Sequence, residues 1–167
     1  MATASPVRVG QVGCGYWGPN LLRNLQASAA CNLAAVADAS GERRSFVADR
    51  FPAARLYANW HDLVEDPDLQ AVVVATPAAT HFTIVEAALQ AGKHVLVEKP
   101  MATSTAEVDA LSRIADRRGL VLMVGHTFIY NDAVRRLKTM IDDGELGDIV
   151  YLYSQRLNLG QLRSDVN

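Results

Sequence analysis

The chain has 167 residues, half of them hydrophobic, and a formal net charge of −2. This length suits one domain with a substantial core, and the near-neutral charge argues against nucleic acid or an anionic membrane as the main partner. No apolar run approaches the roughly 20 residues that cross a bilayer, and residues 1–6 do not resemble a signal peptide. The only cysteines, Cys14 and Cys31, suit neither a disulfide framework nor a metal cluster. We therefore expect small buried thiols in a reducing cytoplasm.

A short valine-rich run over residues 7–12 leads into a glycine loop, and a predicted helix follows over residues 21–30. In a dinucleotide-binding loop the first glycine makes a tight turn and the second lets a pyrophosphate approach the backbone. The third lets helix and strand pack closely. The anion would lie at the positive end of the helix. A glycine triplet alone is a weak signal, so the rest of the chain must support it. The loop reads Gly13-Cys14-Gly15-Tyr16-Trp17-Gly18.

An acidic residue, Asp38, closes the next apolar segment, residues 32–37, twenty positions after Gly18. At that distance a carboxylate is placed to accept hydrogen bonds from the adenosine ribose hydroxyls. The alternative is that Asp38 caps a helix over residues 40–50. We favour the ribose role because of the glycine loop. The carboxylate would repel a 2′-phosphate, which predicts NAD over NADP, although Arg43 and Arg44 lie close enough in sequence to accommodate that phosphate.

Strand and helix patterns alternate from there to residue 124. A β-branched run at residues 71–75 is typical of a strand covered on both faces, and the following helix repeats its apolar residues at intervals of three and four. This alternation predicts a doubly wound parallel α/β sheet. The expected segments are a short strand at 56–57, a helix at 60–65, strands at 71–75, 94–97 and 120–124, and helices at 80–90 and from 105 to 119.

The pattern changes after Gly125. Residues 131–143 predict a helix, residues 144–147 a turn, and residues 148–159 a long strand. That strand has no sequence left to pair with, and an unpaired edge promotes association. We therefore expect the strand either to drive dimerisation or domain swapping or to be disordered.

Three motifs in chain order resemble the glucose-fructose oxidoreductase / inositol dehydrogenase / MocA (Gfo/Idh/MocA) family. They are the glycine loop, Ala75-Thr76-Pro77 with His81, and Glu98-Lys99-Pro100, each at the carboxyl end of an expected strand. The resemblance implies an NAD(P)-binding Rossmann domain over residues 1–125. Residues 126–167 would then be the helix and first strand of a truncated substrate or oligomerisation domain. The resemblance covers the chain but only about the first half of a usual member.

The resemblance also implies roles for single residues. Lys99 would be catalytic, lying by the nicotinamide and hydrogen-bonding the reacting hydroxyl, and Glu98 would contact the nicotinamide ribose. Without the motif, Lys99 would be a solvated loop lysine and His81 an ordinary surface or capping residue. The four histidines show no metal-binding spacing, so no metal is expected. The expected cofactor contacts are Gly13, Gly15, Tyr16, Trp17, Gly18, Asp38, Thr76, Pro77, His81, Glu98 and Lys99.

These observations favour an NAD-dependent oxidoreductase that transfers hydride between a nicotinamide and a secondary hydroxyl of a sugar, nucleotide sugar or cyclitol. Residues 126–131, 144–149 and 155–160 resemble members that act on sugars, with nucleotide-linked sugars oxidised at the ring 3-position as the nearest match. The family's catalytic histidine would lie beyond Asn167. One alternative is a non-catalytic nucleotide-binding or interaction module. Another is methyl transfer from S-adenosylmethionine, in which Glu98-Lys99-Pro100 has no role. The expected partners are a small sugar substrate and further copies of the chain.

Overall fold

The computed structural model describes residues 5–155 and residue 157, which fall into two compact units. The first ends at Gly125 and the second begins at His126. The first unit is a six-stranded sheet in the order β3-β2-β1-β4-β5-β6, and every neighbouring pair is parallel. The strands are β1 (Val7–Val12), β2 (Cys31–Ala37), β3 (Arg55–Tyr57), β4 (Ala71–Val74), β5 (His94–Val97) and β6 (Leu122–Val124).

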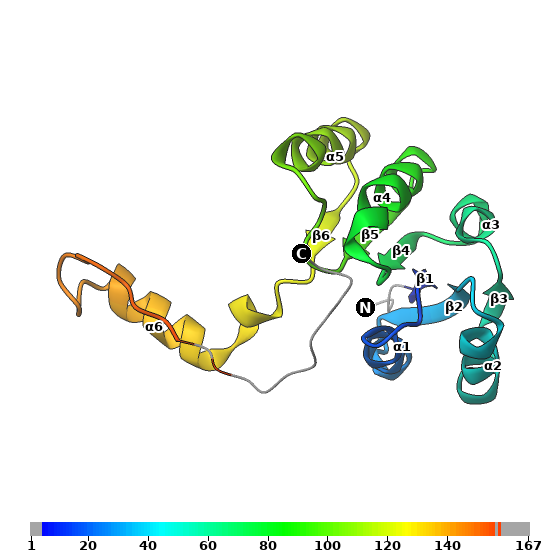
Figure 1. Ribbon diagram of the computed structural model, residues 1–167, viewed down its shortest axis with the longest axis horizontal. Helices are drawn as coiled ribbons and strands as arrows, with labels where there is room; N and C mark the ends of the chain where they lie inside the picture. The colour runs from blue at the N-terminus through cyan, green and yellow to red at the C-terminus, as the bar shows by residue number, and fades with distance from the viewer. Residues whose placement is uncertain (1–4, 156, 158–167) are drawn as a thin grey trace. The chain divides into compact units, whose positions relative to one another are not determined.

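Helices cover both faces of this sheet (Figure 1). One face carries α1 (Gly18–Ala27) and α2 (Gly41–Arg50), and the other carries α3 (Trp60–Glu65), α4 (His81–Gln90) and α5 (Thr105–Arg118). Each face has its own hydrophobic cluster, the smaller under α1 and α2 and the larger under the other three helices. Because both faces are covered, β4 is buried at three successive valines. The predicted doubly wound α/β fold is confirmed.

Local chemistry sets the ends of α5. At its start, the Ser104 side chain accepts the Glu107 N–H and the Glu107 carboxylate accepts the Ser104 N–H, which is a complete capping box. At its end, Gly119 adopts a φ of 63°, and the Leu120 N–H donates to the Ala115 carbonyl at 2.9 Å. Residue 120 therefore belongs to the helix terminus, and for that reason β6 begins two residues later than the sequence predicted.

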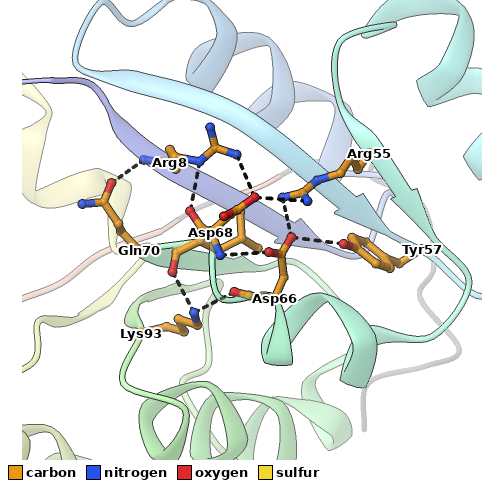
Figure 2. A network of polar contacts seen from close by, with 8 residues as sticks. Arg8, Arg55, Tyr57, Asp66, Asp68, Gln70 and Lys93 are labelled. Carbon is orange, nitrogen blue, oxygen red and sulfur yellow. Dashed lines mark hydrogen bonds and ion pairs between the residues drawn. The ribbon is translucent and has the colours of Figure 1, made fainter.

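A polar network joins β3 to the loop between α3 and β4 (Figure 2). The Asp66 carboxylate is almost fully buried and binds the Arg55 guanidinium, the Tyr57 hydroxyl and the Asp68 N–H. The buried Lys93 ammonium, just before β5, donates to the Asp66 and Leu69 carbonyls at 2.8 and 2.7 Å. These contacts fix the amino-terminal edge of the sheet, opposite the edge at which parallel strands usually carry ligands.

The second unit contains a short 3₁₀ turn, Thr127–Tyr130, and the helix α6 (Asp132–Asp142). The Asn131 side chain caps α6 by accepting the Ala133 and Val134 N–H groups. The helix lies within the predicted range 131–143. No helix in the described residues is long and apolar enough to cross a membrane.

The strand predicted over residues 148–159 is wrong for the part that the structure describes. Residues 148–155 and 157 form no strand, and apolar side chains stand open there, with Tyr151 84% and Leu152 79% exposed. A strand needs a neighbour for its backbone N–H and C=O groups, and the described residues of this unit contain no other strand. Residues 156, 158 and 159 lie outside the described residues. The expected association through this strand therefore has no support in the residues that the structure describes.

Candidate functional site

The glycine loop makes its turn directly against β4. Gly13 has a φ of +94°, and its N–H donates to the Ala37 carbonyl at 2.8 Å. A Cβ atom at this position would lie 2.6 Å from the Ala75 carbonyl oxygen, and one at Gly18 would lie 2.7 Å from the Gly13 carbonyl oxygen. A Cβ at Gly15 would meet nothing within 4 Å. Two glycines thus serve the packing of the loop, and the third leaves an open face.

Gln11 hydrogen-bonds to the backbone at both ends of this loop, a role that the sequence analysis missed. Its fully buried side chain donates from Nε2 to the Gly13 carbonyl at 2.9 Å and to the Gly18 carbonyl at 3.0 Å. The amide thereby ties the end of β1 to the start of α1. The only sequence signal was an uncharged polar residue near the end of a valine-rich strand, next to the loop.

The Asp38 carboxylate lies at the carboxyl end of β2 and is fixed by two backbone donors. Its Oδ2 accepts the Cys14 N–H at 2.7 Å, and its Oδ1 accepts the Ser40 N–H at 2.8 Å. Helix α2 is capped by Ser40, whose side chain accepts the Arg43 N–H. The alternative role of Asp38 as the N-cap is therefore excluded. The Arg44 guanidinium is also engaged, because its Nη1 donates to the Asp38 and Ala39 carbonyls at 2.7 and 2.9 Å.

Cys14 points away from solvent inside the loop. Burial, and next the Asp38 carboxylate, raise the pKa of its thiol, while Arg43 acts in the opposite direction. A raised pKa keeps the thiol neutral and poorly nucleophilic. The structure therefore agrees with the expectation of a buried thiol at Cys14, whereas Cys31 is only half-buried, and both cysteines are free.

A cleft of about 410 Å³ opens at the carboxyl ends of β1, β2 and β4. This is the point where the strand order reverses, and open α/β sheets bind ligands there. Of the predicted site residues, the cleft is lined by Gly13, Gly15, Asp38, Thr76 and Pro77. A second hollow of about 310 Å³ lies between α1 and α2 and contains none of the predicted site residues.

The far wall of the cleft comes from the start of α3, which the sequence analysis did not assign to the site. Asn59 and Trp60 line it. The Asn59 side chain accepts the His61 N–H and so caps the helix. The Trp60 ring stacks on His61 with centroids 3.5 Å apart and an interplanar angle of 26°. Nothing in the pattern separated this half-buried tryptophan from an ordinary core residue.

His81 was expected in the wall of the cleft, but the structure places it behind that wall. The side chain is 1% exposed. Its Nδ1 lies 2.7 Å from the Pro100 carbonyl oxygen and its Nε2 2.8 Å from the Thr76 carbonyl oxygen. The imidazole therefore joins the loop after β4 to the loop after β5. Thr76 is also held by a 2.8 Å hydrogen bond from the Thr80 hydroxyl.

Glu98 and Lys99 leave the carboxyl end of β5, beside β4. The Glu98 carboxylate accepts the Lys99 N–H at 3.3 Å and lies against Gly125, where a Cβ atom would be 3.1 Å from its Oε1. The Lys99 side chain is exposed, and the Lys99–Pro100 peptide bond is cis. Tyr16 and Trp17, also expected to contact a cofactor, are exposed at 85% and 47%. Within the described residues, no cluster of His, Cys, Asp or Glu could hold a metal ion.

Residues 7–126 match the family model described as an oxidoreductase family with an NAD-binding Rossmann fold. The chain belongs to this Gfo/Idh/MocA family. A dTDP-3,4-didehydro-2,6-dideoxy-α-D-glucose 3-reductase from Actinomadura kijaniata is 35% identical over 150 residues, which are 89% of this chain and 45% of that protein. A 1-carboxy-3-chloro-3,4-dihydroxycyclohexa-1,5-diene dehydrogenase from Comamonas testosteroni is 36% identical over 149 residues, 89% of this chain and 37% of that protein.

Solved structures agree with the family assignment. A 3-ketoreductase from Actinomadura kijaniata, in complex with NADP and TDP-benzene, is 34% identical and superimposes with a TM-score of 0.77 over 83% of this chain and 43% of that one. A scyllo-inositol dehydrogenase from Lactobacillus casei with bound NAD(H) has a TM-score of 0.80 over 86% of this chain and 43% of that one. At 24% identity it supports the fold alone. The chain spans less than half the length of each of these relatives.

Proposed function

We propose that this chain is the coenzyme-binding portion of an NAD-dependent oxidoreductase acting on a secondary hydroxyl of a sugar, nucleotide sugar or cyclitol. The observation that carries the proposal is the cleft at the switch point, with the open face of Gly15 on one side and a fixed Asp38 carboxylate on the other. A bound nicotinamide supplies the hydride acceptor or donor, which no protein side chain can replace. One of the relatives named above is a nucleotide-sugar 3-reductase, which supports the substrate class.

The residues of the cleft fit a dinucleotide. The open face at Gly15 gives a pyrophosphate room to approach the backbone. The first turn of α1 contains no acidic residue, so the positive end of that helix is not offset by a carboxylate. The Asp38 oxygens each accept one backbone N–H and keep lone pairs for ribose hydroxyls.

We infer a preference for NAD over NADP. Asp38 would repel a 2′-phosphate, and Arg44, one of the two arginines that could bind such a phosphate, is already committed to the Asp38 and Ala39 carbonyls. The Actinomadura ketoreductase carries NADP, so NADP is the alternative that the measurement must address.

Calorimetric titration of the chain with NADH and NADPH tests the cofactor. Replacing Asp38 with Ala removes a charged hydrogen-bond acceptor, which typically contributes about 1.5–3 kcal/mol, so NADH should bind roughly 10- to 100-fold more weakly. NADPH should lose less or gain. Asp38→Asn, which keeps one acceptor oxygen, should fall between, and Asp109→Ala on the exposed side of α5 is the control. Failure to bind NADH at millimolar concentration, or an unchanged NADH to NADPH ratio in Asp38→Ala, would contradict the assignment.

Lys99 is proposed to hydrogen-bond the reacting hydroxyl of the substrate. Its exposed side chain lies two residues past the carboxyl end of β5, next to β4, which ends at Val74, where a general acid–base group can reach a bound sugar. Hydride transfer to a panel of nucleotide sugars and inositols, followed by nicotinamide absorbance, separates the enzyme from the alternative of a non-catalytic nucleotide-binding module. Lys99→Met should abolish transfer and leave NADH affinity within about threefold. NADH binding with no transfer to any member of the panel would favour the binding module.

Assembly and compartment complete the proposal. A sugar-like small molecule is the proposed partner, and a homo-oligomer is the expected state, which light scattering of the purified chain measures directly. The two free thiols support a reducing cytoplasm. A stable monomer at high micromolar concentration would contradict the oligomer.

A further inference from the structure

We propose that His81 is a positioning residue that carries a proton on both ring nitrogens and, as an imidazolium, holds the Lys99–Pro100 loop against the loop after β4. Its role toward Lys99 rests on the proposed function, whereas its protonation state does not. The proposal follows from what the ring faces rather than from where it lies in the chain.

Each ring nitrogen of His81 faces a carbonyl oxygen. The distances are 2.7 Å from Nδ1 to the Pro100 oxygen and 2.8 Å from Nε2 to the Thr76 oxygen, and both are ordinary hydrogen-bond lengths. Carbonyl oxygens only accept hydrogen bonds. A neutral imidazole has one N–H and one lone pair, so it would donate to one carbonyl and direct its lone pair at the other. Only the doubly protonated ring donates to both.

The alternative orientation of the ring does not remove the conflict. Turning the imidazole over would replace both nitrogens with ring carbons opposite the carbonyls, and C–H groups donate far more weakly than N–H groups. No carboxylate forms an ion pair with His81 among the described residues. The charged side chains on the segments around it are Glu86 on α4 and Glu98 and Lys99 after β5. Burial disfavours a cation, and two charge-assisted hydrogen bonds to carbonyl dipoles oppose that cost.

The His81 ring connects the loop after β4, which lines the cleft, to the loop after β5, which contains Lys99. Thr76 lines the cleft, and Pro100 directly follows Lys99. Thr76 has a second restraint in the Thr80 hydroxyl, whereas the Pro100 carbonyl has no other hydrogen-bond partner recorded among the described residues. Loss of the imidazole should therefore loosen the Lys99 segment more than the cleft wall. A catalytic group displaced by about 1 Å can lose most of its effect, so holding this loop matters for the chemistry.

His94 provides an internal reference of the opposite kind. Its Nδ1 accepts the Val121 N–H at 2.9 Å, so this nitrogen carries a lone pair and no proton. The other two histidines, His61 and His126, are exposed. Replacing both of them with Gln leaves a chain in which His81 and His94 alone contribute ring signals.

Ring nitrogen-15 NMR of that double variant at pH 7, without cofactor, tests the protonation state. We expect one histidine with two protonated ring nitrogens and a second, His94, with one protonated nitrogen and one lone pair. His94→Gln should remove the second set and identify it. Two neutral rings would overturn the proposal, and this outcome is independent of whether the chain binds NADH.

Cofactor affinity tests the positioning role. In His81→Leu, NADH should bind roughly tenfold more weakly, a change of about 1.4 kcal/mol, because the loosened segment also contains Glu98, the expected contact of the nicotinamide ribose. ADP-ribose, which lacks the nicotinamide, should change by less than about threefold. His81→Gln should recover part of the NADH affinity, because one glutamine amide can donate to two carbonyls, as Gln11 does. Equal losses for NADH and ADP-ribose would show a merely structural histidine. If the unaltered chain binds neither ligand, the proposed function fails, and the NMR result still decides the protonation state.

Discussion

Alanine substitutions in the glycine loop should separate the stability of the fold from the binding of the cofactor. Gly13→Ala places a Cβ atom 2.6 Å from the Ala75 carbonyl oxygen, at a residue with a φ of +94°. Gly15→Ala places one in a space with no atom within 4 Å. The same chemical change should therefore have opposite consequences two residues apart.

The expected magnitudes follow from these contacts. A left-handed backbone costs an alanine about 1–2 kcal/mol, and a clash with fixed backbone adds about 1–3 kcal/mol. Gly13→Ala should therefore lower the free energy of unfolding by about 2–5 kcal/mol, a large part of the roughly 5–15 kcal/mol that a domain possesses. Gly15→Ala should change it by less than about 0.5 kcal/mol. Its methyl group would occupy the path of the pyrophosphate, so NADH affinity should fall at least about tenfold.

Urea unfolding followed by circular dichroism, together with NADH titration, measures both quantities. Gly92→Ala is the matched control, because Gly92 has a φ of +76° with nothing within 4 Å of a Cβ atom. It reports the conformational cost alone, and its difference from Gly13→Ala reports the clash. The reasoning would be refuted if Gly15→Ala lost as much stability as Gly13→Ala, or if Gly15→Ala bound NADH as tightly as the unaltered chain.

Three further substitutions test other contacts. Burial raises the pKa of Asp66, but hydrogen bonds from the Asp68 N–H, the Tyr57 hydroxyl and Arg55 outweigh it, so the pKa is lowered overall. The contribution of Asp66 to stability should be complete above the unfolded pKa of about 3.9 and lost as the pH falls through the lower folded value. In Asp66→Asn, the urea concentration at the unfolding midpoint should therefore depend less on pH in this range. Ser104→Ala removes a capping side chain and should cost about 1 kcal/mol in thermal unfolding, with no change in NADH affinity. Gln11→Met keeps the volume but removes the donor to two carbonyls, and it should cost about 1–3 kcal/mol in urea unfolding and weaken NADH binding. The first expectation would be contradicted if Asp66→Asn kept the pH dependence of the unaltered chain. The second would be contradicted if Ser104→Ala unfolded at the same temperature as the unaltered chain, and the third if Gln11→Met bound NADH with unchanged affinity.

The sheet could be predicted because its pattern is local. Strands such as Ala71–Val74 and His94–Val97 are short apolar runs bounded by turn residues, and the structure has them within one residue of the expected ends. The strand at residues 148–159 failed for the opposite reason. Alternating side chains describe a surface that could be buried, but a strand forms only when a neighbour supplies its hydrogen bonds. That information is not local.

Only part of the candidate site could be predicted from the sequence. Asp38, Thr76 and Pro77 line the cleft as expected because each follows directly on a parallel strand. Gln11 and Trp60 escaped notice because their importance depends on which backbone atoms or walls they meet, not on their neighbours in the chain. His81 was assigned to the wall of the cleft, but it lies behind that wall. Its burial behind that wall depends on how α4 packs on the sheet.

The two hydrophobic clusters lie on opposite faces of the sheet and share no residue. Cys14 and Leu22 belong to the smaller cluster, and Val12 and Val74 to the larger. The two faces should therefore open by local unfolding with different free energies, the smaller cluster first, and this order is visible in hydrogen exchange of the α1 and α2 amides. A dinucleotide lying across β1 would protect both faces at once. Slower hydrogen exchange along α2 in the presence of the ligand would then measure how strongly the ligand couples the two faces of the sheet.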